Sequence, residues 1–243
     1  METTSYEDQE IISKYFKKTL ASIFINYPAI LKLSGSVRGK KVLDLGCGAG
    51  WLSAEFCKRK AKVFGVDPST KLIKICNCQN KDIEDINFAV SDGDNLKCFR
   101  NGQFDIVVAN MVFLAVYSRS KLEKMFQEIS RVLKKKGILI FSDCHPFTNA
   151  VGKTCTKISA SNKGFDYFKV GAKYKGTFLL SDYSTIEFVD SYWSLEYYSK
   201  LLNKSGMIIE QIVEPRPVKL DPQKRLKNYR IPEYIIFKCR KTK

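Results

Sequence analysis

A glycine-rich segment that begins with an acidic residue is the part of this 243-residue chain whose chemistry is most specific. It reads Asp44-Leu-Gly-Cys-Gly-Ala-Gly50 and joins an apolar run to a helical pattern. Such a loop between a strand and a helix lets a ligand approach the backbone closely. The dinucleotide pattern G-x-G-x-x-G/A would need a small residue where this chain has Trp51. The acidic start favours a ligand with a cationic amino group over one with phosphates.

Two further carboxylates follow the next two apolar runs. Asp67 ends the run 62–67, and Asp92 follows the run 86–90. A carboxylate at the end of the second strand can accept both hydroxyls of a ribose. Because open α/β sheets bind ligands at the carboxyl ends of their strands, Asp44, Asp67 and Asp92 are predicted to belong to one site.

The elements that would position these residues alternate regularly after residue 40. Apolar runs predict strands at 41–45, 62–67, 86–90, 104–109 and 137–142, and helical patterns occupy 51–60, 69–78 and 121–133. This alternation predicts a parallel sheet with helices on both faces. Strands at 207–213 and 234–238 would give the sheet an antiparallel end. Before residue 40 we expect a helix over 10–25 and a break at Tyr27-Pro28.

The alternation stops at residue 147. A polar stretch runs to about 176, and the runs 176–180 and 185–189 around Ser181–Ser184 predict a hairpin. A helix over 194–202 follows. We therefore expect one domain over 1–243, with an N-terminal helical segment, 1–36, and an insertion, 147–191, that caps the ligand edge. The dense aromatic residues of the insertion are either its own core or the wall of an acceptor pocket.

Composition excludes several classes of protein. Hydrophobic residues make up 44% and charged residues 27%, which excludes a wholly disordered or fibrous chain. No apolar run approaches the roughly 20 residues of a membrane-spanning helix. The first residues are acidic and polar, unlike a targeting segment. The eight cysteines are scattered without a C-x-x-C motif, so we expect reduced thiols, no metal site and a cytoplasmic location.

The charge balance is strongly basic, with 41 Lys and Arg against 25 Asp and Glu and a net charge of +16. Two clusters concentrate it: residues 151–175 carry six lysines against Asp166, and residues 215–230 carry six basic residues against Asp221. The clusters are either a solvated surface or a contact for an anionic partner. We expect both to lie near the acceptor side of the site.

As a set, four segments resemble the successive motifs of class I S-adenosylmethionine-dependent methyltransferases. They are Val42-Leu-Asp-Leu-Gly-Cys-Gly-Ala-Gly50, Gly65-Val-Asp-Pro-Ser69, Asp92, and Phe104-Asp-Ile-Val-Val-Ala-Asn110. The resemblance covers about residues 37–145 and implies a Rossmann-like, seven-stranded, mostly parallel sheet. Further segments resemble a small-molecule subgroup of the type-11 superfamily: Asn26-Tyr-Pro-Ala29, His145-Pro-Phe147, Ser194-Leu-Glu-Tyr-Tyr198 and Glu214-Pro215.

The resemblance implies S-adenosylmethionine as the cofactor and a role for each matching residue. Gly46, Cys47 and Gly48 would line its methionine and ribose, with Asp44 toward its amino group. Asp67 would hold the ribose hydroxyls. The adenine would lie beside Pro68 and Ser69 and meet Asp92 and Gly93, while Asn110 and Met111 would face the sulfonium. Tyr6, Tyr15 or Tyr27 could close over the cofactor.

Methyl transfer is an in-line displacement, so the protein mainly positions the nucleophile and excludes water. A base is needed only when the nucleophile arrives protonated. His145, the only histidine, follows the fifth predicted strand, and its ordinary pKa of about 6.5 suits a general base. Asp143 could orient His145 or bind a cationic substrate. The alternatives are a hydrogen-bonded histidine in a His-Pro turn and a turn aspartate.

Three functions follow from these observations. The first is methyl transfer to a small molecule, because the segment after the fourth strand, Ala109-Asn-Met-Val-Phe113, lacks the Pro-Pro signature of base amino-methyltransferases. The second is methylation of RNA, with the basic insertion and the C-terminal loop as contacts. The third is cofactor binding without catalysis. The acceptor atom and the oligomeric state are not specified by the sequence.

Overall fold

The computed structural model describes residues 4–15, 17–160 and 164–242. Its main feature is a seven-stranded sheet in the order β3-β2-β1-β4-β5-β10-β9. The strands from β1 to β5 are mutually parallel, whereas β10 runs antiparallel to both β5 and β9. The bounds are β1 Lys41–Leu45, β2 Lys62–Asp67, β3 Ile86–Val90, β4 Phe104–Asn110, β5 Leu133–Cys144, β9 Met207–Val213 and β10 Tyr234–Lys241. The predicted Rossmann-like sheet is confirmed.

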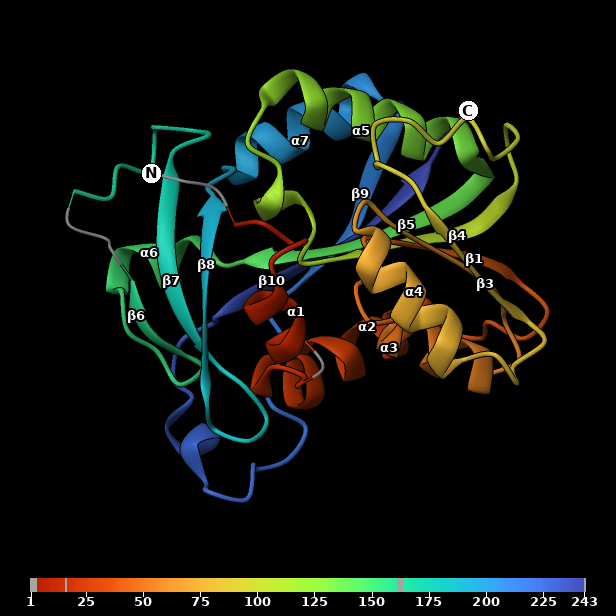
Figure 1. Cartoon of the computed structure of the whole chain (residues 1–243). Helices are drawn as coiled ribbons and strands as arrows, with labels where there is room; N and C mark the ends of the chain where they lie inside the picture. Colours follow the sequence, from red (N-terminus) through yellow and green to blue (C-terminus); the bar gives the residue numbers. More distant parts are fainter. Residues whose placement is uncertain (1–3, 16, 161–163, 243) are drawn as a thin grey trace.

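Helices cover both faces because side chains alternate along the buried strands. Leu43 packs on the face covered by α5 (Arg119–Val132) and α7 (Leu195–Lys204), and Val42 packs on the face covered by α2 (Tyr27–Ser34) and α3 (Trp51–Lys58) (Figure 1). At the edge of the sheet formed by β3, the helix α4 (Thr70–Gln79) contacts β2 and β3. Short helical turns, η2 (Phe113–Ala115) and η3 (Arg225–Asn228), complete the element order. Among the described residues, no helix is long and apolar enough to cross a bilayer.

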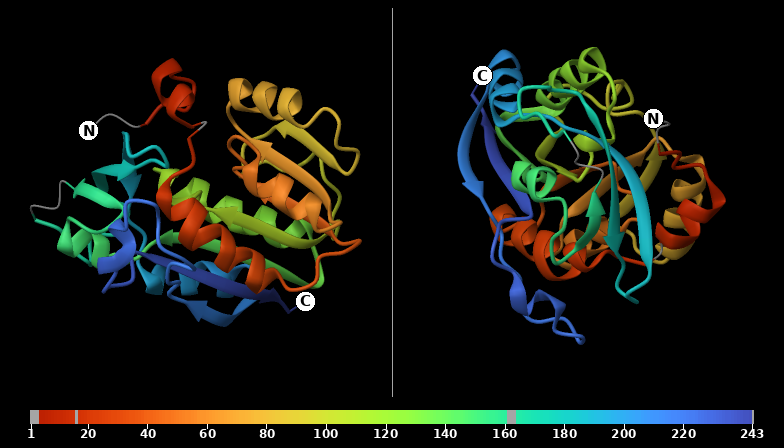
Figure 2. Two further views of the ribbon diagram at one scale, coloured as in Figure 1. Left: turned by 90° about the horizontal axis from the view of Figure 1, so that it is seen from below. Right: turned by 90° about the vertical axis from the view of Figure 1, so that its left-hand side faces the viewer.

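The segment after β5 forms a second sheet beside the main one (Figure 2). It contains α6 (Pro146–Val151) and the antiparallel strands β6 (Lys157–Ala160), β7 (Lys173–Leu179) and β8 (Thr185–Ser191). The predicted hairpin is confirmed as β7 and β8. The strand β6 was not predicted, because its four residues have little apolar patterning and pair only through their contact with β7. A bridge between Thr19 and Leu180 ties this sheet to the N-terminal segment.

The N-terminal segment corrects one prediction. The expected helix over 10–25 is divided into α1 (Gln9–Tyr15) and η1 (Ser22–Asn26), and the expected break at Tyr27-Pro28 is the start of α2. The hydroxyl of Thr19 accepts a hydrogen bond from the Ser22 amide at 3.0 Å, which begins a new helix there. Pro28 lies in the first turn of α2, where no backbone donor is required. Proline therefore starts this helix instead of ending one.

Candidate functional site

The glycine loop after β1 turns sharply because its glycines adopt left-handed backbone angles. The φ angles of Gly46 and Gly48 are +65° and +54°. A Cβ on Gly46 would lie 2.6 Å from Cγ2 of Val112, so a larger residue would clash as well as strain the backbone. The loop thereby brings its backbone close to the end of β4 and leaves open space above the sheet edge.

Asp67 is held rigidly at the end of β2. Its Oδ2 accepts a hydrogen bond from the Gly48 amide at 2.9 Å, and its Oδ1 accepts one from the Ser69 amide at 2.9 Å. The Ser69 hydroxyl in turn caps α4 by accepting a hydrogen bond from the Leu72 amide. The Asp67 side chain is only 7% exposed, and burial raises its pKa. Each carboxylate oxygen keeps a second lone pair that can accept a ligand hydroxyl.

Asp44 is a second buried carboxylate on the same edge. The Ser53 hydroxyl of α3 donates to its Oδ2 at 2.5 Å. Burial raises the pKa of Asp44 to about 7, and the nearby charge of Asp67 adds to this effect. In the described part of the chain, no lysine or arginine forms an ion pair with either carboxylate. The site therefore favours a cationic ligand, which would compensate this buried charge.

Two adjoining cavities open along this edge and share Tyr6, Gly46 and Met111. Together with the space that is open to solvent, the main cavity has a volume of about 940 Å³ and the second about 660 Å³. All but two of the predicted cofactor residues line them: Asp44, Gly46, Cys47, Asp67, Pro68, Asp92, Gly93, Asn110 and Met111. The other two, Gly48 and Ser69, hold Asp67 instead. The second cavity thus contains Asp67 and Asp92, and the main cavity contains Asp44.

The end of β4 is set by a residue that the sequence did not reveal as part of the site. Ser142 on β5 pairs in register with Asn110, and its hydroxyl donates to Asn110 Oδ1 at 2.8 Å. The Met111 amide donates to both the carbonyl and the hydroxyl of Ser142, at 3.2 and 3.1 Å. Met111 has a φ of +57°, a strained angle for a residue with a side chain. The signal that could have indicated Ser142 is its place as the last residue of the predicted strand 137–142, at the edge where ligands bind.

Tyrosines and a lysine complete the inner walls. Tyr6 lines both cavities, and Tyr27 lines the main one. The side chain of Tyr15, the third candidate, lies outside the described residues. Lys121 on α5 forms an ion pair with Asp92 Oδ2 at 2.6 Å, so Asp92 reaches the second cavity with one oxygen already occupied.

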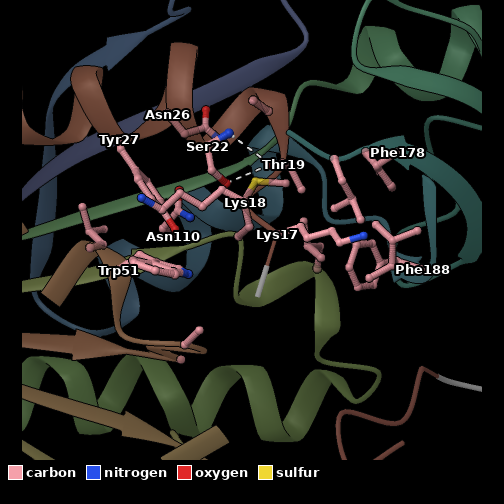
Figure 3. A pocket seen from close by; sticks show the side chains of 18 of the residues that line it. Lys17, Lys18, Thr19, Ser22, Asn26, Tyr27, Trp51, Asn110, Phe178 and Phe188 are labelled. Atoms are coloured by element: carbon pink, nitrogen blue, oxygen red, sulfur yellow. Dashed lines mark hydrogen bonds between the residues drawn. The ribbon is translucent and has the colours of Figure 1, made fainter. Parts of the chain in front are cut away.

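The outer wall of the main cavity comes from two distant parts of the chain (Figure 3). The three-stranded sheet contributes Phe178, Leu180, Ile186, Phe188 and Asp190, and the N-terminal segment contributes Lys17, Lys18, Ser22 and Asn26. Figure 3 shows Phe178 and Phe188 across the cavity from Tyr27 and Trp51. The ammonium of Lys18 lies 4.2 Å from the Trp51 ring centre, and Lys17 forms an ion pair with Asp182. The sequence indicated the aromatic residues of the insertion as one possible wall, but it did not indicate Lys17 and Lys18, which only tertiary packing brings to the cavity.

Asp190, on β8, is the carboxylate that the three-stranded sheet contributes to the outer wall of the main cavity. Its Oδ1 is fully enclosed and accepts no hydrogen bond from any described residue. Burial raises the pKa of Asp190 to about 7, and the charge of Lys157 on β6 partly opposes this. The negative charge of Asp190 also contributes to raising the pKa of Asp143 and Cys144 on β5 and of Tyr117 before α5. A buried carboxylate with this pKa can take up a proton near neutral pH.

His145 and Asp143, the predicted catalytic candidates, do not line the main cavity. His145 caps α6, because its Nδ1 accepts a hydrogen bond from the Phe147 amide at 3.2 Å. Its Nε2 lies 3.1 Å from Glu214, and burial lowers its pKa. Asp143 accepts hydrogen bonds from the Tyr198 hydroxyl and the Cys144 amide and lines a small neighbouring cavity together with Asp190. The side chains of His145 and Asp143 are therefore both engaged in hydrogen bonds within the fold, away from the main cavity.

The two basic clusters do not provide the cationic side chains of the main cavity, which are Lys17 and Lys18 among the residues described. Within residues 151–175, Lys157 is buried and donates to Asn149 Oδ1. The cluster in 215–230 lies on the loop between β9 and β10. Neither cluster lines the main cavity, whose cationic side chains come from the N-terminal segment, and the expectation that the clusters lie near the acceptor side stays a prediction.

Comparison with protein families matches residues 43–141 to a methyltransferase domain. Thiol S-methyltransferase TMT1B of Rattus norvegicus is 32% identical over 118 residues, which are 47% of this chain and 47% of the relative. The chain thus spans about half the length of this relative. Demethylmenaquinone methyltransferase of Staphylococcus saprophyticus is 26% identical over 180 residues, 73% of this chain and 74% of the relative.

Solved structures agree in fold. An S-adenosylmethionine-dependent methyltransferase from Mesorhizobium loti superposes with a TM-score of 0.64 and 21% identity, covering 88% of this chain and 96% of the other. At this identity the likeness supports the fold alone. The matched segment 43–141 contains the glycine loop together with Asp44, Asp67 and Asp92.

Proposed function

We propose that the chain is a class I S-adenosylmethionine-dependent methyltransferase that transfers a methyl group from this cofactor to a small-molecule acceptor, which the match of residues 43–141 to a methyltransferase domain supports. The observation that carries the proposal is the pair of buried carboxylates, Asp44 and Asp67, on two adjoining cavities. Asp67 would accept the ribose hydroxyls, and Asp44 would pair with the amino group. S-adenosylmethionine, when bound, supplies a methyl group already activated on a sulfonium.

The acceptor would occupy the outer part of the main cavity. Its wall combines the apolar side chains Phe178, Leu180, Ile186 and Phe188 with polar groups at separate points. Such a lining favours a compact, largely apolar molecule oriented by a few polar contacts. We propose that residues 147–191 act as a cap that excludes water, within one catalytic unit over 1–243.

We assign the proton-accepting role to Asp190 in place of His145. Asp190 lines the main cavity, whereas both ring nitrogens of His145 have partners outside it. An acceptor hydroxyl, thiol or amine would give its proton to the Asp190 carboxylate as its lone pair attacks the methyl carbon. The other walls hold the acceptor in line and exclude water.

The affinity for adenosylhomocysteine, the demethylated product, should depend on pH through Asp44. The pKa of Asp44 without ligand is about 7, and pairing with the ligand's ammonium group favours the ionised carboxylate. Binding should therefore weaken as the pH falls below 7, by up to about tenfold per pH unit. Calorimetric titration between pH 5.5 and 8 should show this slope in the wild type and its loss in Asp44→Asn. An equal slope in both proteins would contradict the assignment.

Transfer of a labelled methyl group tests the proposed function. The chain is incubated with methyl-labelled S-adenosylmethionine and separate small-metabolite, RNA and protein fractions of a cell extract. We expect label in the small-metabolite fraction, and none when Asp67→Ala replaces the wild type. Label confined to RNA or protein would overturn the small-molecule acceptor.

A further inference from the structure

The loop between β9 and β10, residues 214–233, extends beyond the sheet at the edge that carries the cavities (Figures 1 and 2). Six basic side chains on it are exposed: Arg216, Lys219, Lys224, Arg225, Lys227 and Arg230. None of the six forms an ion pair with a carboxylate of the described residues. The loop therefore presents an uncompensated positive surface.

Two of the three acidic residues of the same loop face inward, whereas Glu214 is exposed and lies 3.1 Å from His145 Nε2. Asp221 is 2% exposed and accepts hydrogen bonds from the Leu226 amide and the Tyr183 hydroxyl. Glu233 is 1% exposed and accepts hydrogen bonds from Thr154 and Thr156. With one exposed carboxylate against six exposed basic side chains, the outer face of the loop is basic.

Two aliphatic side chains project among these cations. Val218 is 62% exposed and Leu220 is 50% exposed, on either side of Lys219. The loop backbone is anchored beneath them, because the Val218 amide donates to the Phe24 carbonyl at 2.9 Å and Leu226 is buried beside Phe24. The exposed apolar tips are thus part of a held conformation.

We propose that the loop 214–233 docks on the surface of an anionic lipid bilayer. Lysine and arginine near a negatively charged leaflet are attracted to its headgroups, and aliphatic tips between them can enter the boundary with the acyl chains. This combination of exposed cations and exposed aliphatic side chains is what such a surface requires. The bilayer contact does not depend on the proposed methyl transfer.

The same observations disfavour RNA as the partner of this loop. Contacts to single-stranded RNA use exposed aromatic rings for base stacking. The loop's aromatic residue, Tyr229, is only partly exposed, and its hydroxyl donates to the Pro215 carbonyl and accepts from the Glu233 amide. The exposed apolar groups are aliphatic, which suits acyl chains and not bases.

The position of the loop places a bilayer next to the main cavity. Tyr234 follows the loop directly and lines that cavity, as do Ala21 and Ser22 near the Phe24 anchor. If the proposed function holds, an apolar acceptor dissolved in the bilayer would have a short path to the cavity wall. The vesicle experiment below tests the docking by itself.

Co-sedimentation of the full chain with lipid vesicles tests the proposal. We expect binding to vesicles of phosphatidylcholine mixed with phosphatidylglycerol, little binding to phosphatidylcholine alone, and weaker binding as salt rises. Val218→Ser combined with Leu220→Ser should weaken binding about tenfold. Lys219→Gln combined with Arg225→Gln should weaken it by about fivefold for each charge removed.

A matched control separates this surface from general basicity. Lys153→Gln combined with Lys169→Gln removes the same charge from exposed positions in the other basic cluster and should leave vesicle binding unchanged. Thermal melting of each variant checks that it is folded. The proposal is overturned if the wild type does not bind anionic vesicles, if the Val218 and Leu220 variant binds as well as the wild type, or if the chain binds a single-stranded RNA oligomer in preference to vesicles.

Discussion

Replacing Asp67 with alanine should reduce the affinity for adenosylhomocysteine by about 100-fold or more. A hydrogen bond to a charged group contributes about 1.5–3 kcal/mol, and this carboxylate is placed to accept two from a ribose. The substitution also leaves the Gly48 and Ser69 amides without their partner, which loosens the loop and the start of α4. The lost hydrogen bonds to the ribose and the loosened loop both lower the affinity for the ligand. Calorimetric titration and the thermal shift caused by the ligand measure the loss.

Asp105→Ala is the matched control for this experiment. Asp105 also accepts a backbone hydrogen bond, from the Lys41 amide at 2.9 Å, but it lies at the start of β4, on the edge opposite the cavities. We expect this variant to melt at a lower temperature while binding the ligand normally. Equal binding by Asp67→Ala and the wild type would remove Asp67 from the cofactor site.

Asp190→Asn should lower the turnover rate by about 10² to 10⁴ for an acceptor that arrives protonated. The asparagine keeps the size of the side chain but cannot take up a proton. Because the pKa of Asp190 is raised to about 7, the wild-type rate should increase with pH up to about 7 and then level off. The variant should lose this dependence while binding adenosylhomocysteine normally. Rates against pH with the acceptor found by labelled transfer provide the measurement.

His145→Ala and Asp143→Asn are the controls for the base assignment. His145 caps α6 and Asp143 is held by Tyr198, so both variants should lose stability and keep most of the turnover rate. A rate that depends on His145 and not on Asp190 would restore the histidine as the base.

The main sheet could be predicted closely from the sequence. The bounds of β1, β2, β3 and β9 agree with the predicted runs, because short apolar segments bounded by polar residues have few alternatives in a parallel sheet. The strand β5 is longer than the predicted 137–142, since pairing with β4 and β10 extends it into the lysine-rich segment and beyond. The N-terminal helices were less predictable, because contact with the second sheet at Leu180 helps to decide where they begin.

The residues of the candidate site likewise divide into those that the sequence could predict and those that it could not. Asp44, Asp67 and Asn110 could be predicted because each lies at the carboxyl end of its own strand, and these ends meet at one edge of the sheet. Asp190, Lys17 and Ser142 could not, since their positions depend on how distant segments pack around that edge. The proposed cofactor half is thus determined locally along the chain, and the proposed acceptor half by tertiary structure.

Calorimetric titration of adenosylhomocysteine into the wild-type chain tests the central claim most directly. The two adjoining cavities predict saturable binding of one ligand per chain, with heat that disappears in Asp67→Ala and persists in Asp105→Ala. Absence of binding by the wild type, or binding that is the same in Asp67→Ala, would contradict the account.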